Sequence, residues 1–182
     1  MRIVGGAWRG RSLAAPAGRA TRPTADRVRQ ALFDMLLHAP WGGRTAVEGA
    51  RVLDAFAGTG ALGLEALSRG AGHATFIECA RPALAALRAN VAACRASATI
   101  LAGDALDPPP ITPCALVFLD PPYGADLVAR CVAALQRVGA LAPAALLIAE
   151  IGRAEAPPFG PPLAERVHGA ARLLVWRSRP IA

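Results

Sequence analysis

The chain has 182 residues, a formal net charge of +7 and no lysine, so its 20 basic residues are all arginines. This length suits one domain with a sizeable core. No apolar run approaches the roughly 20 residues of a membrane span, and the N-terminus lacks the apolar segment of a signal peptide. The cysteines at positions 79, 94, 114 and 131 form no Cys-x-x-Cys pair. We therefore expect no metal site and reduced core thiols in a cytoplasmic protein.

The excess positive charge lies almost entirely in the N-terminal region. Residues 1–30 hold seven arginines and one acid, Asp26, for a net charge of +6. Residues 31–182 hold 13 arginines and 12 acids, for a net charge of +1. Such a concentration of charge is typical of a surface that binds phosphates. It favours a nucleic-acid partner over a solvated arm without one.

A hairpin and a helix are expected in this basic region. Residues 2–6 and 12–14 are predicted to be short strands joined by a turn, in which Trp8 either stacks on a base or covers apolar surface. A helix is predicted over residues 24–37, with Thr24 as its N-cap and an apolar stripe at helical spacing. Residues 40–43 then break the chain. Residues 1–43 are thus predicted to form a basic extension, and residues 44–182 the main domain.

A glycine-rich stretch, residues 54–63, organises the main domain. It follows an apolar strand at residues 51–53 and precedes a helix expected over Ala61–Ser68. Gly58, Gly60 and Gly63 let the backbone approach a ligand, and free N–H groups at the helix start point at it. The spacing suits a nicotinamide dinucleotide as well as S-adenosylmethionine, so the glycines alone leave the cofactor open.

Strands and helices alternate through the rest of the chain. Strands are predicted at residues 75–78, 99–102, 115–119 and 144–150, and helices over residues 82–94 and 126–138. Two late strands are expected near residues 163–168 and 172–176. This alternation predicts an α/β fold with a mostly parallel, doubly wound sheet and right-handed crossovers, closed by an antiparallel pair at one edge.

The segment Asp120-Pro121-Pro122-Tyr123 follows an apolar strand, and ligands of open α/β sheets bind outside the carboxyl ends of the strands. A dehydrogenase has no use for this segment, whereas an enzyme that methylates the exocyclic amine of a base does. The Asp120 carboxylate and the Pro121 carbonyl can accept from the amine, while the prolines stiffen the backbone. Tyr123 offers a face for stacking of the base. The alternative is an ordinary Pro-Pro turn.

Three further carboxylates follow or end predicted strands. Asp54 lies beside the glycine turn. Glu78 lies 24 residues later, at the end of the next strand, where a carboxylate can accept both ribose hydroxyls of a nucleotide. Asp104 can accept from an adenine amine or serve as a turn aspartate. The non-functional alternatives are a capping role for Asp54 and a solvated Glu78.

The motifs together resemble the RsmD family of ribosomal RNA guanine-N2 methyltransferases. Its specific part lies in two N-terminal segments, Arg2-Ile3-Val4-Gly5-Gly6-x-Trp8-Arg9-Gly10-Arg11-x-Leu13 and Arg22-Pro23-Thr24-x-Asp26-Arg27-Val28-Arg29. The glycine turn, residues 66–70 and residues 120–123 follow in the same order. The similarity covers nearly the whole chain and fades after Glu150. It implies a Rossmann-like class I methyltransferase that uses S-adenosylmethionine to methylate a guanine in 16S rRNA, presented by a largely assembled small subunit.

The resemblance also implies roles for individual residues. Asp54 would lie near the methionine end of the cofactor. The implied cofactor-binding residues are Asp54, Phe56, Ala57, Gly58, Thr59, Gly60, Glu78, Asp104, Ala105 and Asp120. The implied catalytic residues are Asp120, Pro121, Pro122 and Tyr123. The arginines expected to contact RNA are Arg9, Arg11, Arg22, Arg27 and Arg29. Ala80 departs from the family, which usually has an acid there, and this weakens the expected cap of the following helix. The protein is expected to be a monomer without a membrane partner.

Three alternatives remain at this stage. A DNA adenine-N6 methyltransferase shares the chemistry but normally needs a larger target-recognition region than thirty residues. A non-catalytic RNA-binding protein with a retained cofactor pocket does not explain the intact Asp54, Glu78 and Asp120. A dehydrogenase leaves residues 120–123 and the basic region unexplained. The histidines at positions 38, 73 and 168 form no cluster, and Glu65 is either functional or a surface charge.

Overall fold

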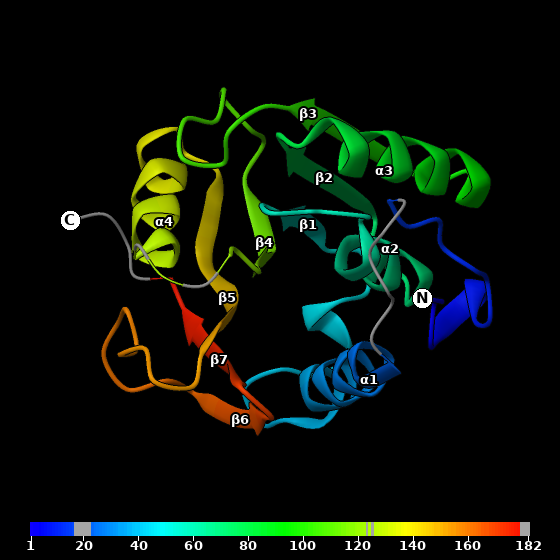
Figure 1. Ribbon diagram of the computed structural model, residues 1–182. Coiled ribbons are helices and arrows are strands. Elements are labelled where there is room, and N and C mark those ends of the chain that lie inside the picture. The colour runs from blue at the N-terminus through cyan, green and yellow to red at the C-terminus, as the bar shows by residue number, and fades with distance from the viewer. Residues whose placement is uncertain (17–22, 123, 125, 179–182) are drawn as a thin grey trace.

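The computed structural model of the protein describes residues 1–16, 23–122, 124 and 126–178, and it is built around a seven-stranded sheet (Figure 1). The strands are β1 (Arg51–Asp54), β2 (His73–Glu78), β3 (Ala98–Ala102), β4 (Cys114–Leu119), β5 (Leu141–Gly152), β6 (Ala164–His168) and β7 (Ala171–Arg177). Their order across the sheet is β3-β2-β1-β4-β5-β7-β6. The first five are parallel, and β7 pairs antiparallel with β5 and β6. The predicted parallel sheet with an antiparallel edge is therefore confirmed.

The helices lie close to the predicted ranges. They are α1 (Pro23–His38), α2 (Ala61–Ser68), α3 (Arg81–Cys94) and α4 (Leu127–Arg137), with short 3-10 turns at Gly6–Trp8 and Arg44–Ala46. Pro82 lies in the first turn of α3, where its missing N–H costs nothing, and Arg95 ends that helix in the left-handed region with φ 49°. The side chain of Thr24, the predicted N-cap of α1, lies outside the described part of the chain.

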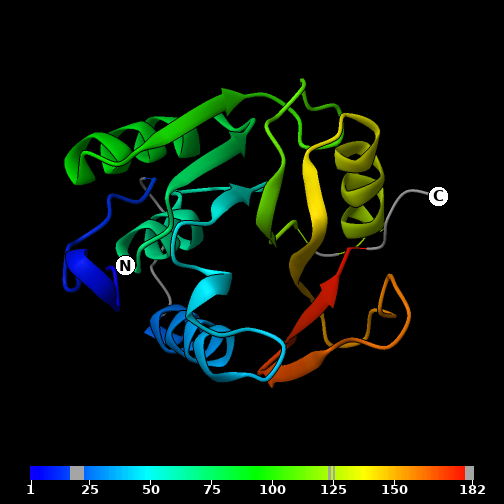
Figure 2. The same cartoon turned by 180° about the vertical axis from the view of Figure 1, so that it is seen from behind.

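The sheet has a hydrophobic layer on each face, because successive side chains of a strand point to opposite sides. Val52 and Phe118 belong to the layer that packs against α1, α2 and α3. Their neighbours Leu53 and Val117 belong to the other layer, which α4 covers. Figures 1 and 2 show α3 beside β3 and α4 beside β5, on opposite sides of the molecule. The carboxyl ends of the strands are left to loops, and these loops carry the predicted site.

The N-terminal hairpin is shorter than predicted. One antiparallel bridge joins Arg2 to Ser12, and the Ile3 N–H donates to the Arg11 carbonyl at 2.9 Å. The connecting turn winds into the 3-10 turn at Gly6–Trp8 instead of extending the strands. Gly6 has φ 74°, and a Cβ there would lie 1.8 Å from the carbonyl oxygen of Ser68. The hairpin is therefore fitted closely against the end of α2.

The N-terminal region shares a hydrophobic core with the rest of the chain. Ile3, Leu13 and Phe33 are buried in the same layer as Val52 and Phe118. Trp8 is half-buried against this layer, which favours its role as a cover for apolar surface. Residues on both sides of position 43 therefore pack into one unit. A separate function for residues 1–43 stays a prediction.

The cysteines only partly match their prediction. Cys94, Cys114 and Cys131 are buried free thiols, as expected. Cys79 is exposed, because it follows the last residue of β2 and precedes α3. No helix among the described residues is long and apolar enough to cross a membrane.

Candidate active site

One carboxylate stands at the carboxyl end of each of the five parallel strands. Across the sheet they follow the order Asp104, Glu78, Asp54, Asp120 and Glu150. Asp54 and Glu78 end β1 and β2, Asp104 and Asp120 follow β3 and β4, and Glu150 lies two residues before the end of β5. Neighbouring strands lie about 4.8 Å apart, so the row extends over roughly 20 Å. The first four were predicted as site residues from the sequence. Glu150 was not, because only the order of the strands shows that β5 lies next to β4.

The glycine turn between β1 and α2 is held by two of these carboxylates. Gly60 has φ 80°, and a Cβ there would lie 2.5 Å from Leu87, so this position requires glycine. The Gly58 N–H donates to Glu78 Oε2 at 2.7 Å. The Gly63 N–H, in the first turn of α2, donates to Asp54 Oδ2 at 3.0 Å. The carboxylates therefore fix the turn that was predicted to hold the cofactor.

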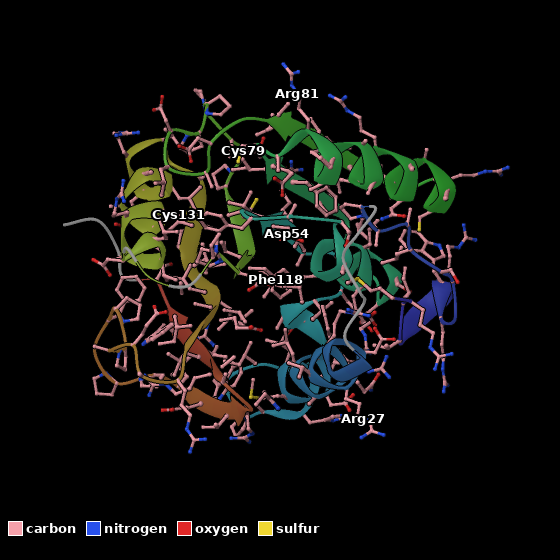
Figure 3. All side chains as sticks on the ribbon, in the orientation of Figure 1. Arg27, Asp54, Cys79, Arg81, Phe118 and Cys131 are labelled. Atoms are coloured by element: carbon pink, nitrogen blue, oxygen red, sulfur yellow. The ribbon has the colours of Figure 1, made fainter. Side chains whose placement is uncertain are left out.

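Asp54 is buried at the centre of the molecule, with 2% of its surface exposed (Figure 3). Burial raises the pKa of its carboxyl group to about 7. The hydrogen bond from Gly63 opposes that rise, and the negative charge of Glu78 adds to it. Asp54 does cap α2, which was its non-functional alternative. Capping alone does not explain why the carboxyl group is buried away from solvent. A nearby positive charge would stabilise the ionised form.

Glu78 and Asp104 remain accessible beside the turn. Glu78 is half-buried, and its Oε1 accepts from the Ala80 N–H at 2.7 Å. Ala80 gives α3 no side-chain cap, as its departure from the family pattern predicted. Asp104 is exposed and forms a turn in which its Oδ1 accepts from the Leu106 N–H at 2.8 Å. Each carboxylate oxygen can accept more than one hydrogen bond, so both side chains keep capacity for a ligand.

The other predicted cofactor residues line the same turns. Phe56 is half-buried, Ala57 and Ala105 are buried, and the Thr59 hydroxyl lies 3.5 Å from the sulfur of Met1. The last contact brings the N-terminus against the glycine turn.

Asp120 is reached by solvent, yet protein atoms surround much of its carboxyl group. The resulting desolvation raises its pKa to about 7, and the charges of Glu150 and Asp54 act in the same direction. Pro121 is buried and Pro122 is exposed, and Tyr123 lies outside the described residues. Asp120 therefore stands between the cofactor turn on one side and Glu150 on the other.

A cavity of about 300 Å³ opens beside Asp120. Asp120 and Glu150 form its acidic edge, and Arg29 and His168 also line it. Its apolar walls come from α1, α2, the strand ends and the N-terminus, and include Met1, Leu32, Leu62, Leu119, Ile148 and Leu173. This mixture of apolar walls and a few polar groups is typical of a site for a small organic ligand.

Comparison with known proteins agrees with this arrangement. Residues 1–168 match the model of the family described as Conserved hypothetical protein 95, the RsmD family. The Ribosomal RNA small subunit methyltransferase D of Escherichia coli strain K12 is 42% identical over 153 residues, which are 82% of this chain and 74% of that protein. The chain belongs to the RsmD family.

Solved structures extend the comparison. The Escherichia coli protein YhhF is 37% identical, has a TM-score of 0.84 and is matched over 98% of both chains. A Thermus thermophilus 16S rRNA N2 G1207 methyltransferase, solved with AdoMet and guanosine, has a TM-score of 0.68 at 21% identity, over 90% of this chain and 45% of that one. The second likeness concerns the fold alone. Together with the observed sheet, these neighbours confirm the predicted class I methyltransferase fold.

The predicted RNA-contacting arginines divide into two groups. Arg9, Arg11 and Arg27 are exposed, and Figure 3 shows Arg27 pointing outward from α1. Arg11 also donates to the carbonyl of Ala93 in the last turn of α3. Figures 1 and 2 accordingly show the N-terminal segment beside that end of α3. Arg22 lies outside the described residues.

The expectation that Arg29 lies on an RNA-contacting surface is wrong. Only 4% of its surface is exposed. Its guanidinium pairs with Asp26 at 2.7 Å and with Glu65 at 3.6 Å, and also donates to the Arg2 carbonyl. Buried ion pairs of this kind compensate one another's charge, so Arg29 supports the fold of the extension.

Glu65 is fully buried, which excludes the surface charge considered from the sequence. Its two oxygens accept from the Val4 and Gly5 N–H groups, both at 2.8 Å, and it pairs with Arg69 at 2.8 Å. This RsmD-family chain thus uses one carboxylate on α2 to fix its N-terminal segment. The N-terminal segments that carry the family resemblance gave no signal of this contact.

Proposed function

We propose that the protein transfers a methyl group from S-adenosylmethionine to the N2 amine of a guanine in 16S rRNA. The observation that carries this proposal is the row of carboxylates at the strand ends, in a chain of the RsmD family. Asp104 would accept from the adenine amine of the cofactor and Glu78 from its ribose. Asp54 would lie beside its cationic methionine end. Asp120 follows where the reacting amine would lie.

The residues present suit this cofactor. Glu78 has the position and the free acceptor capacity for two ribose hydroxyls. Asp54, a buried carboxyl with a pKa near 7, gains a favourable interaction when a positive charge is placed beside it. S-adenosylmethionine supplies a methyl group already activated on a positively charged sulfonium, so the protein mainly has to orient the acceptor.

Asp120 would prepare the amine for attack. The lone pair of the guanine N2 amine is delocalised into the ring, which makes the nitrogen a poor nucleophile. Hydrogen bonds from the amine to the Asp120 carboxylate and the Pro121 carbonyl would rotate it and localise the lone pair. The bound cofactor would supply the methyl group to N2, and its sulfur would keep the electron pair of the carbon–sulfur bond. N2 then releases one proton, for which Asp120 is a nearby base.

The exposed arginines of the N-terminal region would bind the RNA backbone. Arg9 and Arg11 lie on the hairpin and Arg27 lies on α1, so their charges face solvent from two neighbouring elements. Arginine forms paired hydrogen bonds with phosphate and keeps its charge at any physiological pH. We further propose that the substrate is the guanine within a largely assembled small subunit, that the enzyme acts in the cytoplasm as a monomer, and that no metal takes part.

Methylation of small-subunit particles tests the function. Particles from cells that lack the protein are incubated with purified protein and labelled S-adenosylmethionine, and the modified nucleoside is mapped. We expect N2-methylguanosine at one position of the 16S rRNA. Methylation confined to adenine, or to DNA supplied in the same reaction, would support the adenine-N6 alternative instead.

Asp120→Asn tests the assigned mechanism within the same assay. The variant keeps the size of the side chain and one acceptor oxygen but loses the charge. We expect unchanged cofactor affinity and a single-turnover rate lower on the order of a hundredfold. A rate within a few-fold of wild type would refute the role of Asp120, while parallel loss of stability and activity would indicate that it only holds the turn.

A further inference from the structure

The polar groups that line the cavity beside Asp120 also indicate which kind of ligand the cavity binds. Its walls are apolar, whereas its edge at the sheet holds two carboxylates, Asp120 and Glu150. An ionised carboxylate only accepts hydrogen bonds. Arg29 also borders the cavity, but its charge is balanced by ion pairs with Asp26 and Glu65, and its buried Nε lacks a hydrogen-bond partner among the described residues. The edge of the cavity therefore favours a flat ligand that presents two donors side by side.

The two carboxylates are neighbours by strand register. Leu119 of β4 pairs with Ala149 of β5, so the following residues, Asp120 and Glu150, lie side by side toward the carboxyl ends of these strands. Parallel strands lie about 4.8 Å apart, which brings the two carboxyl groups within reach of one base. Their proximity also shows in the effect of the Glu150 charge on Asp120.

Guanine presents such a pair of donors on its Watson–Crick edge. Its N1–H lies next to its N2 amine, whereas adenine carries an acceptor at N1. We propose that Glu150 accepts the N1–H of the target guanine while Asp120 accepts from the N2 amine, which makes Glu150 the residue that selects guanine. This inference rests on the proposed function and adds the basis of its base specificity.

The selection would act mainly by rejecting other bases. A base with an acceptor at N1 would place its lone pair against the lone pairs of the Glu150 carboxylate, which is repulsive. Sites built to bond a substrate N–H reject analogues that lack it far more strongly than apolar pockets reject a change of size. The discrimination should therefore appear in the rate of transfer from the bound state as well as in binding.

The analogue 2-aminopurine tests this contact, because it keeps the 2-amino group and has no hydrogen on N1. It also lacks the 6-oxo group, so the change in preference caused by Glu150→Gln, and not the wild-type preference alone, reports the N1 contact. Small subunits are reconstituted with guanine or 2-aminopurine at the methylated position, and single-turnover rates are measured with saturating cofactor. We expect wild type to prefer guanine on the order of a hundredfold. Glu150→Gln, which can donate to N1 as well as accept, should reduce that preference to less than about tenfold.

Two controls make the result decisive. Glu48→Gln removes an exposed carboxylate paired with Arg44, outside the cavity residues, and should keep the full preference. Glu150→Asp keeps an acceptor, so it should retain a preference for guanine at a lower rate. The fluorescence of 2-aminopurine also reports binding of the base directly. It should show tighter binding to Glu150→Gln than to wild type.

The outcomes separate this inference from the proposed function. If wild type methylates guanine and 2-aminopurine equally well, or if Glu150→Gln keeps the wild-type preference, the role of Glu150 is wrong and the function stands. If Glu150→Gln does not fold, the preferences of wild type and Glu150→Asp decide. If wild type methylates no guanine in 16S rRNA, the proposed function fails and the role of Glu150 fails with it.

Discussion

Asp54→Asn should make the free energy of unfolding less dependent on pH between pH 5 and pH 8. Burial raises the pKa of Asp54 from 3.8 to about 7. Because the folded-state pKa lies above the unfolded one, the stabilisation from the bound proton is complete below about pH 4 and is lost as pH rises through 7. Between pH 5 and pH 7 the pH rises by two units, and each unit lowers the free energy of unfolding by about 1.4 kcal/mol. Wild type should therefore lose about 2–3 kcal/mol between pH 5 and pH 8 through this residue alone.

The variant should not show this loss. Asparagine keeps an oxygen that can accept from the Gly63 N–H, now 3.0 Å from Asp54 Oδ2, but it does not titrate. Its amide brings N–H donors into a dry site, which costs about 1–3 kcal/mol at every pH if they stay unpaired. The absolute stability at one pH is therefore less informative than its change with pH. Urea unfolding at pH 5 and pH 8, for wild type and variant, gives the four free energies of unfolding that are needed.

The matched control is Asp107→Asn at the surface, paired with Arg137 at 3.3 Å. We expect the difference between Asp54→Asn and wild type to change by about 2–3 kcal/mol between the two pH values, and the Asp107→Asn difference to stay within about 0.5 kcal/mol. Asp54→Asn should also bind S-adenosylmethionine more weakly, since the carboxylate that stabilises the cation is gone. An Asp54→Asn difference that is the same at pH 5 and pH 8 would refute the raised pKa.

Two further predictions concern the cofactor and the RNA. The affinity for S-adenosylmethionine relative to S-adenosylhomocysteine should rise from pH 5.5 to pH 8, because only the former carries a sulfonium and the carboxyl group of Asp54, with a pKa near 7, must ionise to stabilise it. Calorimetry measures both affinities, and a ratio independent of pH would contradict this. Replacement of Arg9, Arg11 and Arg27 by Gln should lower the salt dependence of RNA binding by about one ion per lost phosphate contact and leave cofactor affinity intact. An unchanged salt slope would mean that these arginines are only solvated. The control with equal charge loss replaces Arg130, Arg153 and Arg166.

The sheet and its helices were predictable because the local signals agree with the tertiary fold. Apolar runs of strand length alternate with helical stripes, and glycine or proline marks most boundaries. At Gly60, for example, the left-handed backbone and the start of α2 follow from the same residue. The site residues Asp54, Glu78 and Asp120 could be named because each directly ends or follows a strand. Their hydrogen bonds to Gly58 and Gly63 were not predicted, because these depend on how the glycine turn folds back on the strand ends.

What failed depends on contacts between distant segments. Glu150 ends a strand that was predicted, but its place beside Asp120 follows from the order of the strands. Arg29 was expected at the surface, because the apolar stripe of α1 left it out. Its burial comes from Glu65, 36 positions further along the chain. No local pattern reports a pair of charges that meet only after two helices have packed together.

Glu65→Gln tests whether this buried carboxylate holds the N-terminal segment in place. The substitution leaves Arg29 and Arg69 buried beside a neutral side chain, and breaking a buried ion pair from one side costs about 3–5 kcal/mol. We expect the free energy of unfolding to fall by about that amount, and the Val4 amide to exchange faster with solvent. The control Asp34→Asn removes a half-exposed carboxylate that lies 4.0 Å from the same Arg69, and a surface pair is worth about 0–1 kcal/mol. If the two variants lose stability equally, Glu65 is no more than another partner of Arg69. A large loss confined to Glu65→Gln would place the anchor of the hairpin on α2, next to the turn that holds the cofactor.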